Sequence, residues 1–480
     1  MQLKHLLFLA LIIFMVNSRI VKVLNIFIPS YPESTYPPTS EQSKVGISPS
    51  AISEEFNFGK QLRYSYGDNL SLSTLNTSQI LYVVPGDAQT VISGLSQFFG
   101  LASPALSLSE DQARNLLSDA EKLGKKVKKI QNEDFQTIEF DDLPALRDSF
   151  RILPSSLLLE SSDYECPSKE AFFNTKRNTI PKEVQTVYKS LKKELDGQAK
   201  NLDELFELYQ QVLLHRLNKN VLPEGISEKT FKDLEYLASV YALYAYYEDK
   251  TVAKINAGSL IKRLFYEMYN EGGHRIVSFG VHQAAFVSLL RAFDILSYNN
   301  TITDFKNSSE EVIQSLVYPH PGSNLIIEVH LDDDNNLIVA AKYKGLDQRI
   351  CGKSSSHCYL TKINKKYKEF VVNNIEAFKS LCTSEINKSD GNQGKGFKFT
   401  DIFYYLGVVL VVYSAYKLLL FVYRVLKMFY DVKRYKKHKK DEHGRVSSPT
   451  GTNENGTTKS VELNETKDAD EWALKEDNYV

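Results

Sequence analysis

The chain has 480 residues and a formal net charge of -1 at neutral pH. Hydrophobic residues make up 42% of it and charged residues 24%, a composition typical of globular domains. The near-neutral balance argues against nucleic acid as a partner, because nucleic-acid-binding proteins present an excess of basic charge.

The N-terminus, residues 1–18, has the organisation of a secretory signal peptide. Lys4 and His5 form a weakly basic start, and residues 6–16 are an unbroken apolar run of the length expected for a signal-peptide core. Residues 16–18 offer small or modest side chains for cleavage before Arg19. A buried strand or helix is the weaker alternative, because the run stands at the extreme N-terminus.

Strands and helices alternate in the segment that follows. Residues 21–28 are apolar and β-branched, which predicts a buried strand, and a Pro- and Ser-rich stretch follows. Apolar spacing then predicts a helix over residues 52–66, a strand over 79–84 and a helix over 89–99.

The middle of the chain, about residues 103–250, is predicted to be a helical insertion. Apolar residues recur at three- and four-residue spacing over residues 111–129, 182–218 and 229–248. The last of these helices carries an aromatic stripe, which we interpret as a packing face rather than a binding platform. The stripe comprises Tyr236, Tyr241, Tyr244, Tyr246 and Tyr247.

Alternation resumes after the insertion. The pattern predicts a helix over residues 253–270, a strand over 275–279, a helix over 283–296, and strands over 325–331 and 337–343. The acidic link at 332–336 lacks the glycine and distal glutamate of a calcium-binding EF-hand loop, so we interpret it as a solvated hairpin turn. The sequence therefore predicts an α/β domain with a helical insertion.

The C-terminal part predicts one membrane span. Residues 387–401 contain a glycine-rich stretch and are interpreted as a stalk. Residues 402–423 are apolar over the length of a bilayer-spanning helix, with Lys417 near one end. The cluster of basic residues that follows marks the cytosolic side, which makes the chain a single-pass type I membrane protein. The tail, 424–480, is predicted to be cytosolic and disordered.

This orientation places the acceptor sequons and the cysteines outside the cytosol. Glycosylation is expected at Asn69, Asn76, Asn299, Asn307 and Asn387, whereas Asn455 and Asn464 head sequons in the tail. An even number of cysteines in an oxidising compartment suggests two disulfides among Cys166, Cys351, Cys358 and Cys382. The chain has no Cys-x-x-Cys pair, which argues against a zinc site, and we expect no metal and no cofactor.

The segment around His282 is the strongest candidate for a site. Residues 275–286 read as strand, turn and helix, which places His282 at the carboxyl end of a strand, where open α/β sheets bind ligands. A single histidine there is more often structural than catalytic.

Residues 279–285, Phe-Gly-Val-His-Gln-Ala-Ala, resemble the histidine acid phosphatases, in which a strand ends in Tyr-Ser-Ala-His-Asp-Thr-Thr and a helix follows. Residues 254–261 are similar to the family's preceding helix, residues 318–343 to its closing hairpin, and residues 52–66 to the helix after its first motif. The resemblance covers about residues 21–385. It implies a three-layer, phosphoglycerate-mutase-like histidine phosphatase fold in a luminal domain of residues 19–386. It also implies one short bridge, Cys351 to Cys358, and one long-range bridge, Cys166 to Cys382.

The family's catalytic groups are mostly missing. In the family a histidine attacks phosphorus, arginines bind the phosphate, and an Asp beside a second histidine protonates the leaving alcohol. The first motif, Arg-His-Gly-x-Arg-x-Pro, corresponds here to residues 30–36, Ser-Tyr-Pro-Glu-Ser-Thr-Tyr. Tyr31 therefore occupies the nucleophile position and Gln283 the proton-donor position, and His282 alone is retained.

Three hypotheses follow. The first is a pseudophosphatase that binds an unknown luminal ligand or protein in a cleft lined by Tyr31, Glu33, His282 and Gln283. The second is an active acid phosphatase in which His274, Arg275, Lys60 and Arg63 supply the missing charge. The third is a structural or trafficking role carried by the basic tail. The sequence leaves open whether the protein forms a homodimer. It also leaves open whether the final compartment is the plasma membrane or an endolysosome.

Overall fold

The computed structural model describes residues 19–383, with gaps at 33–46, 71–76, 105, 154–165, 196–198, 271–272, 308–316 and 353–355 and over most of 110–148. All described elements belong to one compact unit, Met1–Ile386. The predicted signal peptide, stalk, membrane span and tail lie outside the described residues, as do Glu33, Asn76, Asn387 and the predicted helix at 119–129. Among the described helices, none is both long and apolar enough to cross a bilayer.

The core is a mixed sheet whose strands lie in the order β3-β2-β4-β1-β5-β6-β7, with β8 pairing to β6. Strands β3, β2, β4 and β1 run parallel to one another. The pairs β1–β5, β5–β6, β6–β7 and β6–β8 are antiparallel. The strands are β1 Arg19–Phe27, β2 Ile80–Pro85, β3 Phe150–Leu153, β4 Ile276–Gly280, β5 Asn324–Leu331, β6 Leu337–Tyr343, β7 Leu346–Gln348 and β8 His357–Tyr359.

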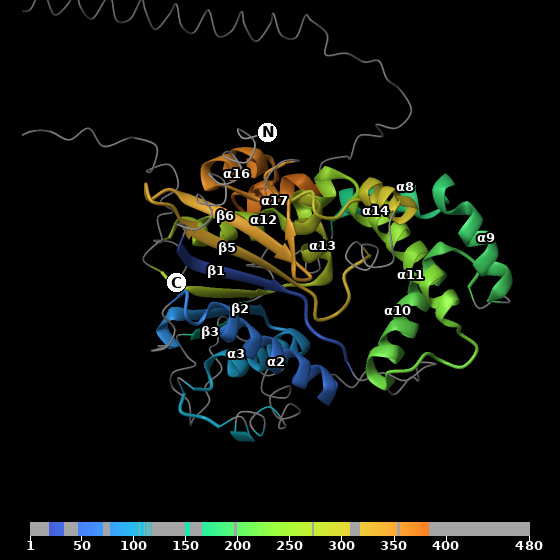
Figure 1. Ribbon diagram of the computed structural model, residues 1–480. Coiled ribbons are helices and arrows are strands. Elements are labelled where there is room, and N and C mark those ends of the chain that lie inside the picture. The colour runs from blue at the N-terminus through green and yellow to red at the C-terminus, as the bar shows by residue number, and fades with distance from the viewer. Residues whose placement is uncertain are drawn as a thin grey trace, which may run out of the picture. The chain divides into compact units, whose positions relative to one another are not determined.

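Helices cover both faces of the sheet, which makes three layers (Figure 1). Helices α2 and α3 pack on one face, and α12, α13 and α16 pack on the other. Strand β1 serves both layers because its side chains alternate: Val23 and Phe27 enter one core, and Leu24 and Ile26 enter the other. The helices are α2 Pro49–Tyr66, α3 Ala88–Ala102, α12 Lys250–Tyr269, α13 Gln283–Ala292, α16 Leu360–Tyr367 and α17 Ile375–Thr383.

A second helical group lies beside the sheet (Figure 1) and has its own core. Its helices are α8 Pro167–Arg177, α9 Gln185–Glu194, α10 Leu202–Lys219, α11 Glu228–Ala242 and α14 Tyr298–Asn307. The aromatic stripe packs as predicted: Tyr241 is fully buried, Tyr236 stacks on Phe305 and Tyr246 stacks on Phe173. The predicted α/β fold with a helical insertion is therefore confirmed.

Two helix boundaries predicted from the sequence are wrong, and one strand was not predicted. The helix predicted over 182–218 is a 3-10 turn at Lys182–Val184 followed by α9 and α10, because Asn201 starts a new helix. Its side chain accepts from the backbone of Glu204, whose carboxylate accepts from the backbone of Lys200. The helix predicted to reach residue 296 ends at Ala292, because Asp294 adopts φ +56°, outside the right-handed helical range. The insertion also contributes an edge strand, β3, which its helical pattern did not indicate.

Both predicted disulfides are present. Cys166, which precedes α8, bonds to Cys382 of α17, and Cys351 bonds to Cys358 across the loop between β7 and β8. No described cysteine is free. The long bridge joins residues 216 apart and holds the start of the helical group to the last described helix.

Candidate functional site

The carboxyl ends of three parallel strands meet at one edge of the sheet. In the ladders, Phe27 of β1 lies beside Gly280 of β4, and Phe279 of β4 lies beside Val83 of β2. The segments that leave these strands therefore share the edge where open α/β sheets bind ligands. Tyr31 follows β1, and His282 and Gln283 follow β4, so their predicted positions are close along this edge.

Tyr31, at the predicted nucleophile position, is a packing residue. Its side chain is 1% exposed and lies in a small apolar cluster with Ile47 and Ile92. Its hydroxyl donates to Glu54 Oε1 at 2.9 Å and lies 3.4 Å from Ser50 Oγ. Burial raises the pKa of the Tyr31 hydroxyl. A neutral, buried phenol is a poor nucleophile.

His282 and Gln283 begin α13. His282 is the N-cap residue, its side chain does not cap the helix, and its carbonyl accepts from the backbone of Phe286 at 3.0 Å. The Gln283 side chain is engaged, because its Nε2 donates to the carbonyl of Pro319 at 2.7 Å. The residue at the family's proton-donor position therefore holds a neighbouring loop.

That loop, residues 317–323, brings a histidine to the same edge. Gly322 adopts φ +79°, and its backbone N–H donates to the carbonyl of Pro29 at 3.2 Å. Pro29 lies two residues after the end of β1. His320 Nε2 lies 2.8 Å from Glu235 Oε1 of α11 and 3.0 Å from the Tyr209 hydroxyl of α10. We call Tyr209, Glu235 and His320 the interdomain triad, because it joins the helical group to the loop.

Sequence reasoning missed the interdomain triad. The one signal in the sequence was His320 itself, which stands between Pro319 and Pro321 just before a strand. Its partners come from two helices more than 80 residues earlier, and no local pattern links them.

Lys344 is a further basic residue at this edge. It follows β6, whose Tyr343 pairs with Leu325 at the start of β5. Burial lowers the pKa of Lys344 to about 8, and the negative charge of Glu235 partly opposes that shift. Two basic groups therefore face Glu235 at this edge. His320 lies in the loop before β5, and Lys344 follows β6.

The residues predicted to supply charge to an active enzyme lie elsewhere. His274 and Arg275 precede β4, at the opposite edge of the sheet from His282. Arg275 donates to the carbonyl of Leu70, and Arg63 donates to the carbonyl of Gly100 at 3.2 Å. Lys60 lies one turn before Arg63 in the second half of α2. These four residues are not brought together.

A buried polar chain lies beneath the edge. Asn25 of β1 donates to Gln97 Oε1 at 2.9 Å, and Gln97 donates to Glu55 Oε2 at 2.7 Å. The other carboxyl oxygen of Glu55 has no partner among the described residues. Burial raises the pKa of Glu55 to about 8, so this carboxyl group is mostly protonated at neutral pH.

The described residues form no cluster that could bind a metal ion. Among them, no three His, Cys, Asp or Glu side chains come together in a way that could hold an ion. All four cysteines are engaged in disulfides and cannot act as thiolate ligands.

The sequence matches no protein-family model and no curated protein. Solved structures match its fold. The Hafnia alvei phytase in complex with tartrate is 12% identical, with 75% of this chain and 98% of that chain covered at a TM-score of 0.50. The Bifidobacterium longum multiple inositol polyphosphate phosphatase in complex with inositol hexasulfate is 10% identical, covering 75% of this chain and 94% of that chain at 0.49. The D. castellii phytase is 13% identical, with 76% of this chain and 82% of that chain covered at a TM-score of 0.47.

These similar proteins are histidine acid phosphatases, so the described domain is an α/β domain with the histidine acid phosphatase fold. The predicted resemblance is confirmed over about three quarters of the chain. The match to the Hafnia phytase carries this assignment, and at 12% identity it concerns the fold alone.

Proposed function

We propose that this protein is a membrane-anchored pseudophosphatase of the secretory pathway. Its luminal domain would bind a ligand or partner protein at the carboxyl edge of the sheet without hydrolysing phosphate esters. A single membrane span at residues 402–423 would hold it as a type I protein, at the plasma membrane or in endolysosomes. The basic tail would contact the inner leaflet.

The state of Tyr31 carries this proposal. The residue is 1% exposed and its hydroxyl is bonded to Glu54, so it can neither attack phosphorus nor attract a phosphate. No histidine or arginine occurs between Lys22 and Lys44 to take over either role. The covalent route of the family needs a histidine at this place.

The charge at the edge supports the same conclusion. A charge-assisted hydrogen bond contributes about 1.5–3 kcal/mol, and about 1.4 kcal/mol is a tenfold change in affinity. Losing the two arginines of the first motif would therefore weaken phosphate binding by several powers of ten. The edge offers His320 and Lys344 instead, and both face the carboxylate of Glu235. A neutral or cationic ligand suits such a cleft better than a phosphate ester.

One observation favours the alternative, an active acid phosphatase with a rearranged site. The interdomain triad and Lys344 gather a histidine, a tyrosine, a carboxylate and an amine at the same edge as His282. Such groups are the usual elements of acid–base chemistry. In this alternative His320, rather than a residue after β1, would attack phosphorus.

One assay separates the two functions. The fragment 1–386, which contains the compact unit, is secreted, purified and given an aryl phosphate at acidic pH beside the Hafnia alvei phytase as a positive control. We expect no turnover above the buffer blank, and no change in His282→Ala or His320→Ala. Turnover that either substitution abolishes would establish the active alternative.

A further inference from the structure

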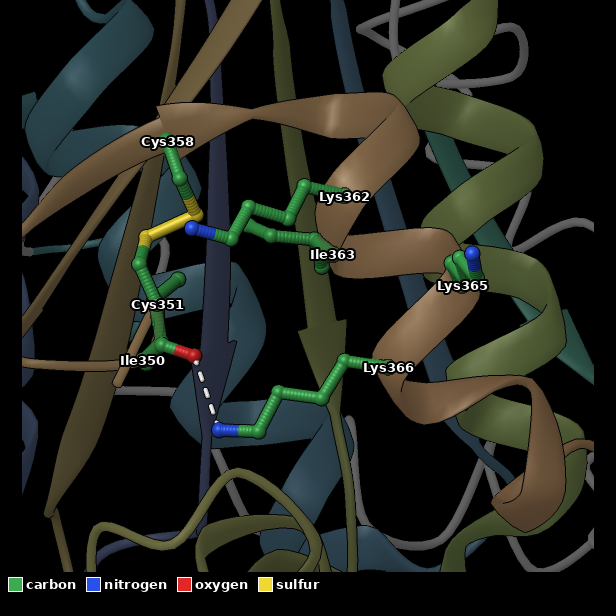
Figure 2. A pocket seen from close by; sticks show the side chains of 7 residues that line it. All are labelled: Ile350, Cys351, Cys358, Lys362, Ile363, Lys365 and Lys366. Carbon is green, nitrogen blue, oxygen red and sulfur yellow. Dashed lines mark hydrogen bonds between the residues drawn. A yellow bond between two sulfur atoms is a disulfide. The ribbon is translucent and has the colours of Figure 1, made fainter.

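A cavity of about 270 Å³ lies beside the short disulfide (Figure 2). It is separate from the edge that carries His282. Its lining residue Lys366 pairs with Asp294, two residues beyond the end of α13, whereas His282 precedes the first residue of that helix. A helix of this length spans about 15 Å, so the two places lie at opposite ends of it. The cavity is lined by Ile350, Cys351, Cys358, Lys362, Ile363, Lys365 and Lys366.

The lysines share one face of α16. Lys365 and Lys366 lie three and four residues after Lys362, the spacing that places side chains together on a helix. Figure 2 shows Lys362 and Lys366 extending from α16 toward the segment of Ile350 and Cys351. Like charges at this spacing destabilise a helix, so the fold gains nothing from gathering them.

Only one of these lysines is neutralised within the described structure. Lys366 Nζ lies 3.1 Å from Asp294 Oδ2 and donates to the carbonyl of Ile350 at 3.2 Å. Lys362 and Lys365 are exposed and have no hydrogen-bond or ion-pair partner among the described residues. No acidic side chain among the described residues lines the cavity, so the two unpaired charges favour an anion and disfavour a cation.

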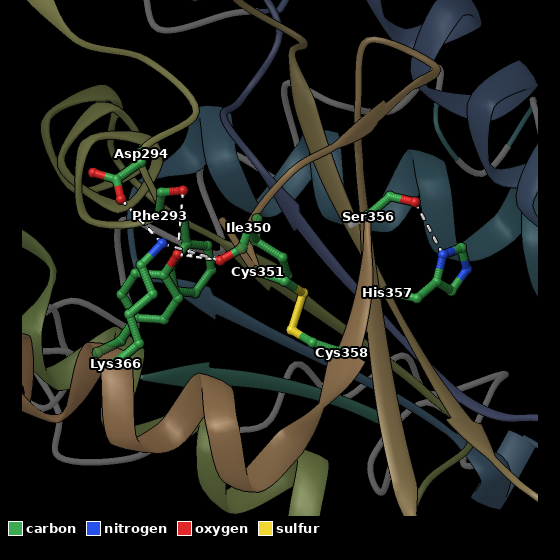
Figure 3. The surroundings of a disulfide bond; sticks show 9 residues. Phe293, Asp294, Ile350, Cys351, Ser356, His357, Cys358 and Lys366 are labelled. Atoms are coloured by element: carbon green, nitrogen blue, oxygen red, sulfur yellow. Dashed lines mark hydrogen bonds and ion pairs between the residues drawn. A yellow bond between two sulfur atoms is a disulfide. The ribbon is translucent and has the colours of Figure 1, made fainter. Parts of the chain in front are cut away.

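The remaining walls are apolar and fixed. Ile350, Ile363 and the disulfide supply them. Figure 3 shows the Ile350 carbonyl accepting from Lys366. The Tyr367 hydroxyl also donates to this carbonyl, at 2.6 Å. The disulfide ties Cys351 to Cys358, next to the start of α16. A rigid apolar wall beside unpaired charges is preformed for an amphipathic ligand.

We propose that this cavity binds a small organic anion with an apolar body. The anionic head would lie at the mouth of the cavity, which Lys362 and Lys365 flank, and the body would pack on the disulfide and on the small exposed edges of Ile350 and Ile363. Aryl sulfonates and alkyl carboxylates have this chemistry, as does the headgroup end of an anionic lipid. The site is independent of whether the domain hydrolyses phosphate esters.

The first experiment measures lysine protection in the full-length protein, held in nanodiscs of neutral phosphatidylcholine. Amine labelling read by mass spectrometry reports each lysine separately. We expect 2-naphthalenesulfonate to slow labelling of Lys362 and Lys365 about tenfold near saturation. Neither methanesulfonate, which lacks the apolar body, nor neutral 2-naphthalenemethanol should do so. Lys189 and Lys193, exposed on α9, serve as reference lysines and should not change.

Matched variants test the assignment. Calorimetry on Lys362→Gln/Lys365→Gln should show naphthalenesulfonate binding weakened about tenfold or more, with near-UV circular dichroism unchanged. The control Lys189→Gln/Lys193→Gln should bind like the wild type. Protection without added sulfonate in phosphatidylserine nanodiscs would support the site and identify a membrane lipid as the anion. Equal binding by the neutral alcohol, equal protection on α9, or an unchanged affinity in the first variant would overturn the proposal.

Discussion

At the scale of single residues, the most unusual group is the carboxyl of Glu55. It is fully buried, receives one hydrogen bond from Gln97, and keeps one oxygen without a described partner. Burying a charged carboxylate this way is costly, so the group stays protonated well above its usual pKa. Proton binding is therefore part of the folded state.

Glu55 predicts that the domain loses stability as pH rises. Its folded pKa is raised from 4.5 to about 8, so its contribution is fully present below about pH 4.5 and is lost through about pH 8. Across that window the free energy of unfolding should fall by about 1.4 kcal/mol per pH unit from this group alone. Urea unfolding at about pH 5, 7 and 9 measures the slope.

Glu55→Gln should remove that slope while keeping the acceptor for Gln97. Glu54→Gln is the matched control, because its carboxylate is exposed and its oxygen can still accept from Tyr31. The control should keep the wild-type slope, with the upper end of the pH window somewhat lower, because the charge of Glu54 helps to raise the pKa of Glu55. A Glu55→Gln variant as pH-dependent as the wild type would show that other groups set the alkaline limit.

At the scale of elements, the contact between α10, α11 and the loop at 317–323 helps to hold the helical group, together with the long disulfide. The interdomain triad contributes one residue from each of these three elements. Glu235 is 16% exposed and His320 30% exposed, so water competes little for their hydrogen bond. Ser239 of α11 adds a second contact, since its Oγ accepts from the backbone of Tyr318 at 3.0 Å.

His320→Leu should therefore loosen α10 and α11. The change leaves Glu235 largely buried without its main partner, which costs about 1–3 kcal/mol. Amide hydrogen exchange should quicken in both helices while the strands of the sheet keep their protection. A double-mutant cycle with Glu235→Leu is the check: the two changes together should cost less than their sum. Strict additivity would mean that the two side chains are not coupled.

Helix ends were the least predictable elements. The helical spacing of apolar residues continues without interruption over residues 182–218, across the break between α9 and α10. The start of α10 depends on the local pair Asn201 and Glu204, which satisfies backbone amides at the new helix end. The sequence contains this capping pair, because a glutamate follows the asparagine at the three-residue spacing of a capping box. The left-handed turn at Asp294 had no comparable signal.

At the scale of the whole molecule, the order of elements predicted an α/β domain with a helical insertion, and the resemblance to the histidine acid phosphatases implied the fold and both disulfides. The site was predictable only in part. His282 could be placed because it directly follows a strand, and strand ends are visible in hydrophobic patterns. The interdomain triad could not, because Tyr209 and His320 are 111 residues apart and meet only through packing. The lysines of α16 have the spacing that places side chains on one face of a helix. The cavity beside them, however, depends on the disulfide of Cys351 and on Asp294 after α13, and neither contact can be read from the local sequence.

The proposed membrane orientation leads to the last prediction, which concerns glycans. Asn69 and Asn299 are exposed in the described structure, so the oligosaccharides expected there would project into solvent without disturbing a core. If residues 402–423 cross the membrane once with the basic cluster inside, the five luminal sequons are modified and Asn455 and Asn464 are not. Glycosidase treatment of the full-length protein from secretory cells should shift its mass, and Asn69→Gln and Asn299→Gln should each remove one step. Asn455→Gln/Asn464→Gln is the matched control and should change nothing. A loss of mass in that control would reverse the orientation, place the domain in the cytosol, and leave its two disulfides without an oxidising compartment to form in.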